Sequence, residues 1–209
     1  PVAIKLGQLL ATRADVFGEA VANDLAHLKD RLAPFPLAEA EQAIEASLGR
    51  PVAALYARLE PATAAASIAQ AHPAVLHDGR RVAVKVLRPG VERRVAADIR
   101  AMRLAARLAH ALVPPARRLE PQALVATVAQ ALTLELDLRM EAAAASELRA
   151  VMADDPYMRA PEPVWEATGA RVLTLTWAEG LPLSDPASLE QPGIDRVVLA
   201  NNVIRGFLA

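Results

Sequence analysis

The chain has 209 residues, a formal net charge of −1 and 54% hydrophobic residues, enough to bury a sizeable core in one large or two small domains. Acidic and basic residues are interspersed without a basic stripe or an acidic tail, so we expect no nucleic-acid partner. The absence of cysteine excludes disulfides, thiolate catalysis and cysteine zinc sites, and the four scattered histidines show no metal-ligand spacing.

No apolar stretch reaches the roughly 18 to 20 residues that a membrane span requires. Arginine interrupts each long apolar segment, as in AMRLAARLAHALV at 101–113. The opening PVAIKLGQLL lacks the basic start and the cleavage pattern of a signal peptide, and it reads as the interior of a longer protein. We therefore expect a chain that does not cross a bilayer.

The first fifty residues are predicted to be helical. Apolar residues recur at helical spacing over 3–32 with one interruption, which predicts two helices. Pro36 then opens a helix, LAEAEQAIEASL at 37–48, which Gly49 closes as a left-handed cap. Pro51 begins a further short turn.

The next segment changes to short apolar runs. HDGR at 77–80 is a hairpin signal and predicts antiparallel strands over 68–76 and 81–87. The second strand lies in RVAVKVLR, where Lys85 shares a face with the small residue Ala83. Two interpretations stay open: an edge strand whose lysine reaches water, or a lysine that binds an anion.

The remainder alternates between helix and strand. Long alanine-rich helices are predicted over 91–113 and 121–152, on either side of a double proline. Strands are expected near 162–166 and 170–177, and the connector AEGLPLSD leads into a last helix that begins near residue 194. The order of elements indicates an α+β protein.

The second long helix carries three acidic residues within seven positions. Asp137 and Glu141 stand four apart, where like charges repel by a few tenths of a kcal/mol, whereas Glu135 has Arg139 as a favourable partner at i+4. A nearby cation would remove the repulsion. A solvated charged face is the other interpretation, and both stay open.

Four motifs together resemble the UbiB family of atypical kinase-like proteins, which is associated with ubiquinone biosynthesis. VAVK is similar to the V-A-I-K motif that supplies a strand lysine to nucleotide phosphates in protein kinases. The others are IKLGQLLATRAD at 4–15, ATAAASIAQAH at 62–72 and LELDLRMEAAAA at 134–145. The similarity extends over the whole chain. It implies an N-terminal helical extension over 1–58, a kinase-like N-lobe over 59–178 and the beginning of a helical C-lobe over 179–209.

The resemblance also implies a site for ATP with Mg²⁺. Lys85 would hold phosphate and pair with Glu141, while Glu135 and Asp137 would form an E-x-D motif that faces the site. Ala64, Ala65, Ala66 and Ser67 stand where kinases have a glycine-rich loop, so the loop should be stiffer. Without the resemblance, this AAAS run would read as a packed strand entry. The implied cofactor-binding residues are Ala64, Ala65, Ala66, Ser67, Ala83, Lys85, Leu175, Trp177 and Ala178, with Leu175 at the back of the pocket and the last two at the adenine edge.

The helical extension carries a K-x-G-Q signature made of Lys5, Gly7 and Gln8. Lys5 and Gln8 share a helix face, and alone they could mark a surface helix end. In proteins similar to this one the extension folds over the nucleotide pocket, with the lysine near the E-x-D carboxylates. That arrangement disfavours phosphorylation of ordinary protein substrates and favours ATP hydrolysis coupled to a lipid-like partner.

The implied function is an atypical kinase or ATPase that supports ubiquinone biosynthesis. Its partners would be a nucleotide, a prenylated quinone precursor or membrane lipid, and other ubiquinone-biosynthesis proteins, and its place would be cytoplasmic and peripheral to the inner membrane of a bacterium. No H-x-D catalytic loop occurs, so we expect the metal ligands in a missing C-lobe and weak nucleotide binding at most by this chain. The alternative is a non-catalytic nucleotide- or lipid-sensing scaffold. An unrelated helical interaction protein would require all four motif matches to be accidental.

Overall fold

The computed structural model describes residues 2, 18–19, 33–181, 183 and 186–208. The two helices predicted within 3–32 and the K-x-G-Q signature lie outside these residues.

The helix predicted after Pro36 is confirmed. α4 (Leu37–Leu48) ends at Gly49, whose φ of 66° is left-handed and strains any residue but glycine. α5 (Val52–Leu55) follows Pro51, again as predicted. Ile44 on the inner side of α4 is fully buried, so this helix packs against the sheet that follows.

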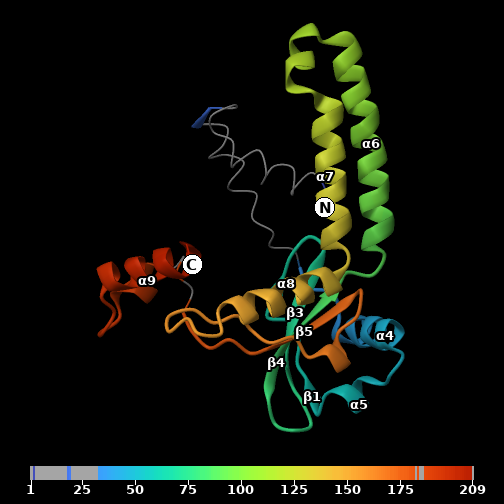
Figure 1. Cartoon of the computed structure of the whole chain (residues 1–209). Coiled ribbons are helices and arrows are strands. Elements are labelled where there is room, and N and C mark those ends of the chain that lie inside the picture. Colours follow the sequence, from blue (N-terminus) through green and yellow to red (C-terminus); the bar gives the residue numbers. More distant parts are fainter. Residues whose placement is uncertain (1, 3–17, 20–32, 182, 184–185, 209) are drawn as a thin grey trace.

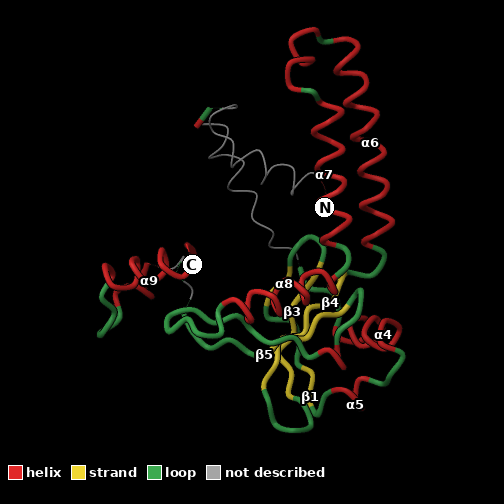
Figure 2. The backbone as a smooth tube through the Cα atoms, viewed as in Figure 1, coloured by secondary structure: helices red, strands yellow, loops and turns green. Residues whose placement is uncertain are grey.

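Five antiparallel strands form one sheet within the described residues (Figure 2). Their order is β1-β3-β4-β5, and β2 pairs with β3 on the same side as β1. The predicted hairpin is confirmed, since β3 and β4 pair from Ala69–Leu87 to Val75–Arg81 around a turn in which Gly79 has a φ of 87°. The bounds are β1 (Arg58–Leu59), β2 (Ala64–Ala65), β3 (Ala69–Val75), β4 (Arg81–Leu87) and β5 (Val172–Thr176).

A pair of antiparallel helices projects from the sheet between β4 and β5 (Figure 1). α6 (Val91–Leu112) runs outward, the short 3₁₀ helix η1 (Pro114–Leu119) turns the chain at the double proline, and α7 (Pro121–Glu135) returns. We call this pair the arm, residues 91–135. In the part of the chain that the structure describes, no helix is both long enough and apolar enough to cross a membrane.

The single helix predicted over 121–152 is wrong, because the structure divides it. α7 ends at Glu135 and α8 (Leu138–Val151) begins after Asp137, which has an extended backbone with φ −112° and ψ 96°. The side chain of Asp137 accepts the backbone N–H of Arg139. Aspartate prefers this capping position to a helix interior because its short carboxylate satisfies a terminal N–H group.

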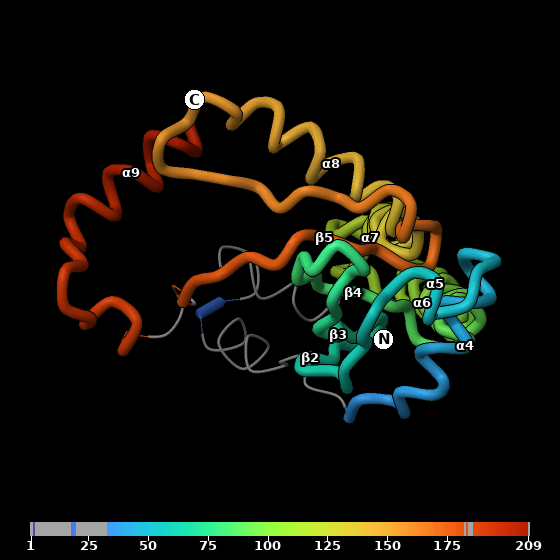
Figure 3. Tube along the Cα trace, turned by 90° about the horizontal axis from the view of Figure 1, so that it is seen from below, coloured from blue at the N-terminus to red at the C-terminus, as the bar shows by residue number. Residues whose placement is uncertain are grey.

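The strand predicted near 162–166 is also wrong. Pro163 forms only an isolated bridge with Leu175, and the chain then turns into the 3₁₀ helix η2 (Trp165–Ala167). Proline has no N–H to donate to a ladder, so pairing does not propagate along this segment. After β5, the chain continues through η3 (Pro186–Glu190) to α9 (Arg196–Leu208), which stands apart from the sheet in Figure 3.

The sheet has a hydrophobic cluster on each face. On one face, α4 packs against β-strand residues that include Val82, Val84 and Val86, all fully buried. On the other face, α8 and the base of the arm pack against Leu87 and Leu173. The strands β4 and β5 are therefore covered on both sides.

A chain of hydrogen bonds made by buried polar side chains links β3 to the backbone of Phe35 and Glu60. The side-chain amide of Gln70 makes two hydrogen bonds with the backbone of Phe35. Gln70 Oε1 accepts the Phe35 N–H at 2.8 Å, and Gln70 Nε2 donates to the Phe35 carbonyl at 3.1 Å. His72 Nδ1 lies 2.8 Å from the Glu60 carbonyl, and its Nε2 lies 2.9 Å from Gln70 Nε2. A carbonyl can only accept, so Nδ1 carries the proton and Nε2 accepts from Gln70, which requires a neutral imidazole.

Stability should fall in mild acid because of His72. Burial lowers the pKa of His72, outweighing the opposing effects of the Glu60 carbonyl and the Glu41 charge. The folded pKa is then below the unfolded value of about 6.5, so the stabilisation is complete above that pH and is lost as the pH falls through the folded pKa. Urea unfolding should show a drop between about pH 8 and pH 5.5 that is smaller in His72→Gln. The exposed His77→Gln control should keep the wild-type drop, and an equal drop in all three proteins would contradict this assignment.

Candidate functional site

An ion pair joins the sheet to the first turn of α8. Lys85 Nζ and Glu141 Oε2 are 2.6 Å apart, and the two side chains are 35% and 46% exposed. The pairing predicted for these residues is present. Such partly exposed pairs contribute only about 0 to 1 kcal/mol to stability, so the importance of this pair lies in where it holds an ammonium group.

β4 places Lys85 in the middle of the sheet. The residue pairs in register with Ala71 on β3 and with Leu173 on β5, so the edge-strand interpretation does not apply. The methyl group of Ala71 fills little space beside the aliphatic part of the Lys85 side chain. The sequence therefore creates room on this face of β4, next to a lysine that the strand holds in place.

Core packing fixes the carboxylate partner. Leu138 and Ala142 of α8 are buried against the sheet, and the Leu138 amide donates to the Ala170 carbonyl at 2.9 Å. Glu141 lies three residues after the first of these and just before the second, in the first turn of the helix. The positive end of the helix dipole is close to a carboxylate there, which is favourable.

A cavity of about 420 Å³ opens beside the ion pair. Its walls come from the alanine-rich loop, the start of β3, β4 and the two helices that meet at Asp137. The lining residues are Ala64, Ala65, Ala66, Ile68, Ala69, Gln70, Ala71, Lys85, Glu135 and Glu141. Most of the wall is apolar and small, while one cation and two carboxylates supply the charge.

The alanine-rich loop is tied into the sheet. The Thr63 amide donates to the Ala71 carbonyl at 3.0 Å, and the Ala66 amide donates to the Ala69 carbonyl at 2.8 Å. The guanidinium of Arg88 donates to the Ala66 carbonyl at 2.8 Å. These amides are occupied by the fold, in contrast to the open N–H groups of a glycine-rich phosphate loop.

The acidic residues separate into two environments. Glu135 is the last residue of α7 and lines the cavity, whereas Asp137 does not. Arg139 was predicted to relieve Glu135 at i+4, but the helix break removes that spacing, and Arg139 instead pairs with Asp137 at 2.6 Å. Hydrogen bonds from the Arg139 side chain hold the pKa of Asp137 below its ordinary value.

The other predicted cofactor residues are not among those that line this cavity. Ser67 is almost fully buried, and Ala83 pairs with Leu175 in the sheet. The Trp177 amide donates to the Arg81 carbonyl at 3.0 Å, so that amide is committed to the fold. None of these residues, nor Ala178, lines the cavity, and their binding roles stay predictions.

Gln70 is a cavity residue that the sequence did not single out. The residue contributes to the cavity wall from β3, while its buried side-chain amide bonds to the backbone of Phe35. A glutamine within an otherwise apolar strand was the available signal, since a buried amide must find partners for its donors and acceptors.

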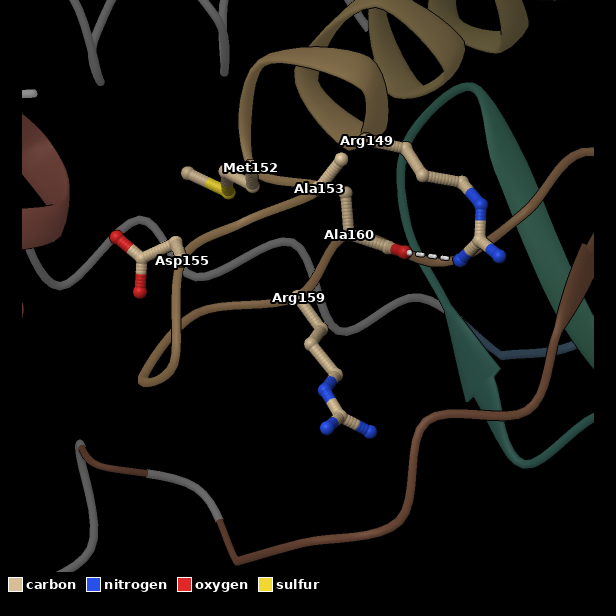
Figure 4. Close-up of a pocket in the computed structure, with 6 residues that line it drawn as sticks. All are labelled: Arg149, Met152, Ala153, Asp155, Arg159 and Ala160. Atoms are coloured by element: carbon tan, nitrogen blue, oxygen red, sulfur yellow. Dashed lines mark hydrogen bonds between the residues drawn. The ribbon is translucent and has the colours of Figure 1, made fainter.

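A second cavity, of about 350 Å³, lies at the end of α8 (Figure 4). Arg149 is already engaged there, with the Ala160 carbonyl at 3.5 Å and Glu162 at 3.4 Å. Figure 4 shows Arg159 extending away from Arg149 rather than converging with it. No residue predicted for the site lines this cavity, and no cluster of three metal-ligating side chains occurs anywhere in the described ranges.

Comparison with known proteins assigns the chain to a recognised group. The sequence profile of the ABC1 atypical kinase-like domain matches residues 27–209. Curated relatives described as "Probable protein kinase UbiB" are 40% identical over 210 residues in Xylella fastidiosa strain M23 and 40% identical over 208 residues in Marinobacter nauticus. Each alignment covers 99% of this chain but only 38% of the relative, so the chain spans well under half the length of these proteins.

A solved structure has a similar fold. The complex of Rv3197 with erythromycin from Mycobacterium tuberculosis aligns with a TM-score of 0.61 and 30% identity. The match covers 86% of this chain and 44% of that one. The kinase-like fold with a small antiparallel sheet, expected from the motifs, is confirmed.

The break between α7 and α8 can be tested at Asp137. Asp137→Ala removes the side chain that accepts the Arg139 amide, and it should lower the free energy of unfolding by about 1 kcal/mol. Asp137→Asn keeps a capping oxygen and should lose much less, because the exposed ion pair contributes little. Urea denaturation measures both values. An asparagine variant as unstable as the alanine variant would show that the charge, rather than the cap, stabilises the start of α8.

Proposed function

The chain belongs to the UbiB family of ABC1 atypical kinase-like proteins, and on that premise we propose that it forms the nucleotide-binding small lobe of an ATPase that supports ubiquinone biosynthesis. The nucleotide is ATP with Mg²⁺, held in the cavity beside Lys85. The observation that carries this proposal is the 2.6 Å pair between Lys85 and Glu141, which fixes one ammonium group at the wall of that cavity.

Lys85 supplies the cation for the phosphates. A lysine ammonium has three donors, and Glu141 occupies one of them, so the others can meet phosphate oxygens. Glu141 also prevents the long side chain from swinging into solvent, which reduces the entropy lost on binding. This ordering of the ammonium favours anion binding, although the adjacent carboxylate offsets part of its charge.

The alanine-rich loop makes this grip different from that of an ordinary kinase. The amides of Thr63 and Ala66 already donate to β3, so they cannot turn toward a phosphate without breaking sheet hydrogen bonds. Phosphate binding therefore relies mainly on Lys85 and on the metal ion. Bound Mg²⁺ would neutralise charge on the phosphates, and its ligands are expected in the part of the longer protein beyond this chain, while Glu135 adds a carboxylate to the cavity wall.

The adenine edge is proposed to lie after β5. Because the Trp177 amide bonds to Arg81, the Trp177 carbonyl and the Ala178 amide are the backbone groups left for a base. The Arg81 guanidinium stacks 4.7 Å from the Trp177 ring centre and pairs with Glu179 at 3.2 Å, which holds this connector. Ala83 and Leu175 would pack against the base from neighbouring strands.

The physiological partner follows from the family alone. We propose a prenylated quinone precursor or membrane lipid, together with other ubiquinone-biosynthesis proteins, at the cytoplasmic face of a bacterial inner membrane. A non-catalytic sensor would share the same nucleotide cavity. Turnover of ATP by the longer protein, measured as phosphate release, separates these two roles.

Loss of the ammonium should weaken nucleotide binding. Lys85→Met keeps the length of the side chain and removes its charge, which should lower affinity for ATP with Mg²⁺ roughly 10- to 100-fold, since hydrogen bonds to charged groups contribute about 1.5 to 3 kcal/mol. Anisotropy of a fluorescent ATP analogue measures the affinity. Arg58→Met removes an exposed charge from β1 and should leave it unchanged. If Lys85→Met binds as tightly as the wild type, Lys85 does not belong to the nucleotide site.

Glu141→Gln tests the positioning role separately. The glutamine side chain can still hydrogen-bond to the Lys85 ammonium but carries no negative charge. The variant therefore keeps the ammonium group and weakens only its attachment to α8. We expect a loss of affinity of less than about tenfold, because one hydrogen bond can still form. A loss equal to that of Lys85→Met would mean that Glu141 itself contacts the nucleotide or its metal ion.

A further inference from the structure

The outer end of the arm stands away from the other described parts of the structure. This distal arm, residues 99–119, comprises the last turns of α6 and the η1 turn. Figure 1 shows it at the tip of the projecting helix pair, remote from the sheet and from α9. Its chemistry differs from that of every other segment of comparable length.

Charge is segregated onto the distal arm. It contains five arginines and no acidic residue, so the rest of the chain carries a formal charge of −6 within a total of −1. The overall interspersion of charge conceals this segment. Four of these arginines are exposed and make no ion pair within the described structure: Arg100, Arg103, Arg107 and Arg118.

Large apolar side chains are exposed beside these arginines. Leu104, Leu108 and Leu112 recur every four residues along α6 with exposures of 51% to 74%. Val113 and Leu119 at the turn are also about half exposed. The buried residues Val95 and Ala106 lie on the opposite side, toward the protein, so the leucines form the outer stripe of the helix.

The two sets form neighbouring stripes. Arg103 and Arg107 are four residues apart, and each immediately precedes a leucine of the outer stripe. The leucines from 104 to 112 extend over about 12 Å of helix at 1.5 Å per residue. The result is an apolar ridge with a row of guanidinium groups along one side.

Arg117 fixes the shape of the tip. Its guanidinium donates to the carbonyls of His110 and Ala111 at 2.9 and 3.3 Å, satisfying the last carbonyl groups of α6. Val113 is extended and ends the helix before the two prolines of η1. The ridge is therefore presented on a defined, convex end rather than on a loose loop.

Building on the membrane partner of the proposed function, we propose that the distal arm is the surface that docks on an anionic lipid bilayer. The leucine ridge enters the boundary between headgroups and acyl chains, and the arginines contact the lipid phosphates at its side. Guanidinium groups bind phosphate in a bidentate manner, which suits a row of headgroups. The contact is peripheral, with the arm lying along or tipped into the interface.

A bilayer fits the shape of this surface better than a folded partner does. The tip is convex and narrow, so a protein would need a matching concave groove to bury both the ridge and the arginines. A fluid interface closes around a convex ridge without such a groove. The missing acidic residues also match a partner whose surface charge is uniformly negative.

The test measures binding of the chain to vesicles of phosphatidylcholine alone and of phosphatidylcholine with about 30% phosphatidylglycerol. We expect sedimentation with the anionic vesicles only, weakening as salt is raised. Arg103→Gln combined with Arg107→Gln should lower the partition coefficient roughly 25-fold, at about fivefold for each arginine near the surface. Leu108→Gln combined with Leu112→Gln should lower it by at least about tenfold. All four positions are exposed, and circular dichroism checks that each variant is folded.

A matched control sits on the same helix. Arg93→Gln with Arg94→Gln removes the same charge at the base of α6, about 20 Å along the helix from Arg107, which exceeds the screening length at physiological salt. This control should lose less than about twofold. An equal loss would make the effect a matter of net charge and overturn the proposal, as would absent binding to anionic vesicles. A dimer by light scattering that the leucine variant abolishes would assign the ridge to a second copy of the chain and likewise overturn it.

The natural absence of cysteine gives an independent readout. A polarity-sensitive fluorophore on Leu112→Cys should shift its emission to the blue on anionic vesicles, because the ridge leaves water. The same fluorophore on Ala46→Cys, exposed on α4, should not shift. Equal shifts at both positions, or none, would exclude docking through the arm.

Discussion

The contact between Lys85 and Glu141 joins the sheet to α8 beside the candidate site, although its own contribution to stability is small. It joins two elements that are otherwise separated by the whole arm, since β4 precedes α6 and α8 follows α7. Each residue is held by packing behind it: the sheet supports the lysine on both sides, and Leu138 with Ala142 anchors the helix that carries the carboxylate. Packing of the core thus fixes the position of the Lys85 ammonium, which as a long solvent-exposed side chain would otherwise be mobile.

The cavity beside this pair is lined largely by alanine residues. Methyl groups along the loop and at Ala71 leave space while making the wall apolar, and the amides of Thr63 and Ala66 donate to carbonyl groups of β3. Phosphate-binding loops usually offer free amides, so in the proposed nucleotide site the affinity for phosphate would depend mainly on the Lys85 ammonium and on a metal ion bound with the nucleotide. A glycine-rich loop offers several backbone amide donors, whereas this cavity has an apolar wall and one ammonium group.

Sequence patterns predicted the elements whose signals are local. Pro36 with Gly49 bounded α4, and the HDGR turn set the β3–β4 hairpin, because turn and cap preferences act over a few residues. The motif resemblance predicted the partner of Lys85, fifty-six residues away, which periodicity could not supply. The break at Asp137 was missed because alanine and leucine on both sides favour helix, and only the tertiary docking of Leu138 on Ala170 reveals the cap. The charge segregation of the distal arm was missed because counts over the whole chain average it away.

The link between α7 and α8 has a mechanical consequence. Only Leu136 and Asp137 separate the two helices, and two residues reach at most about 7 Å when extended. The end of α7 and the start of α8 therefore cannot move farther apart than that distance, so a displacement of α7 along its axis beyond it must also move the helix turn that carries Glu141.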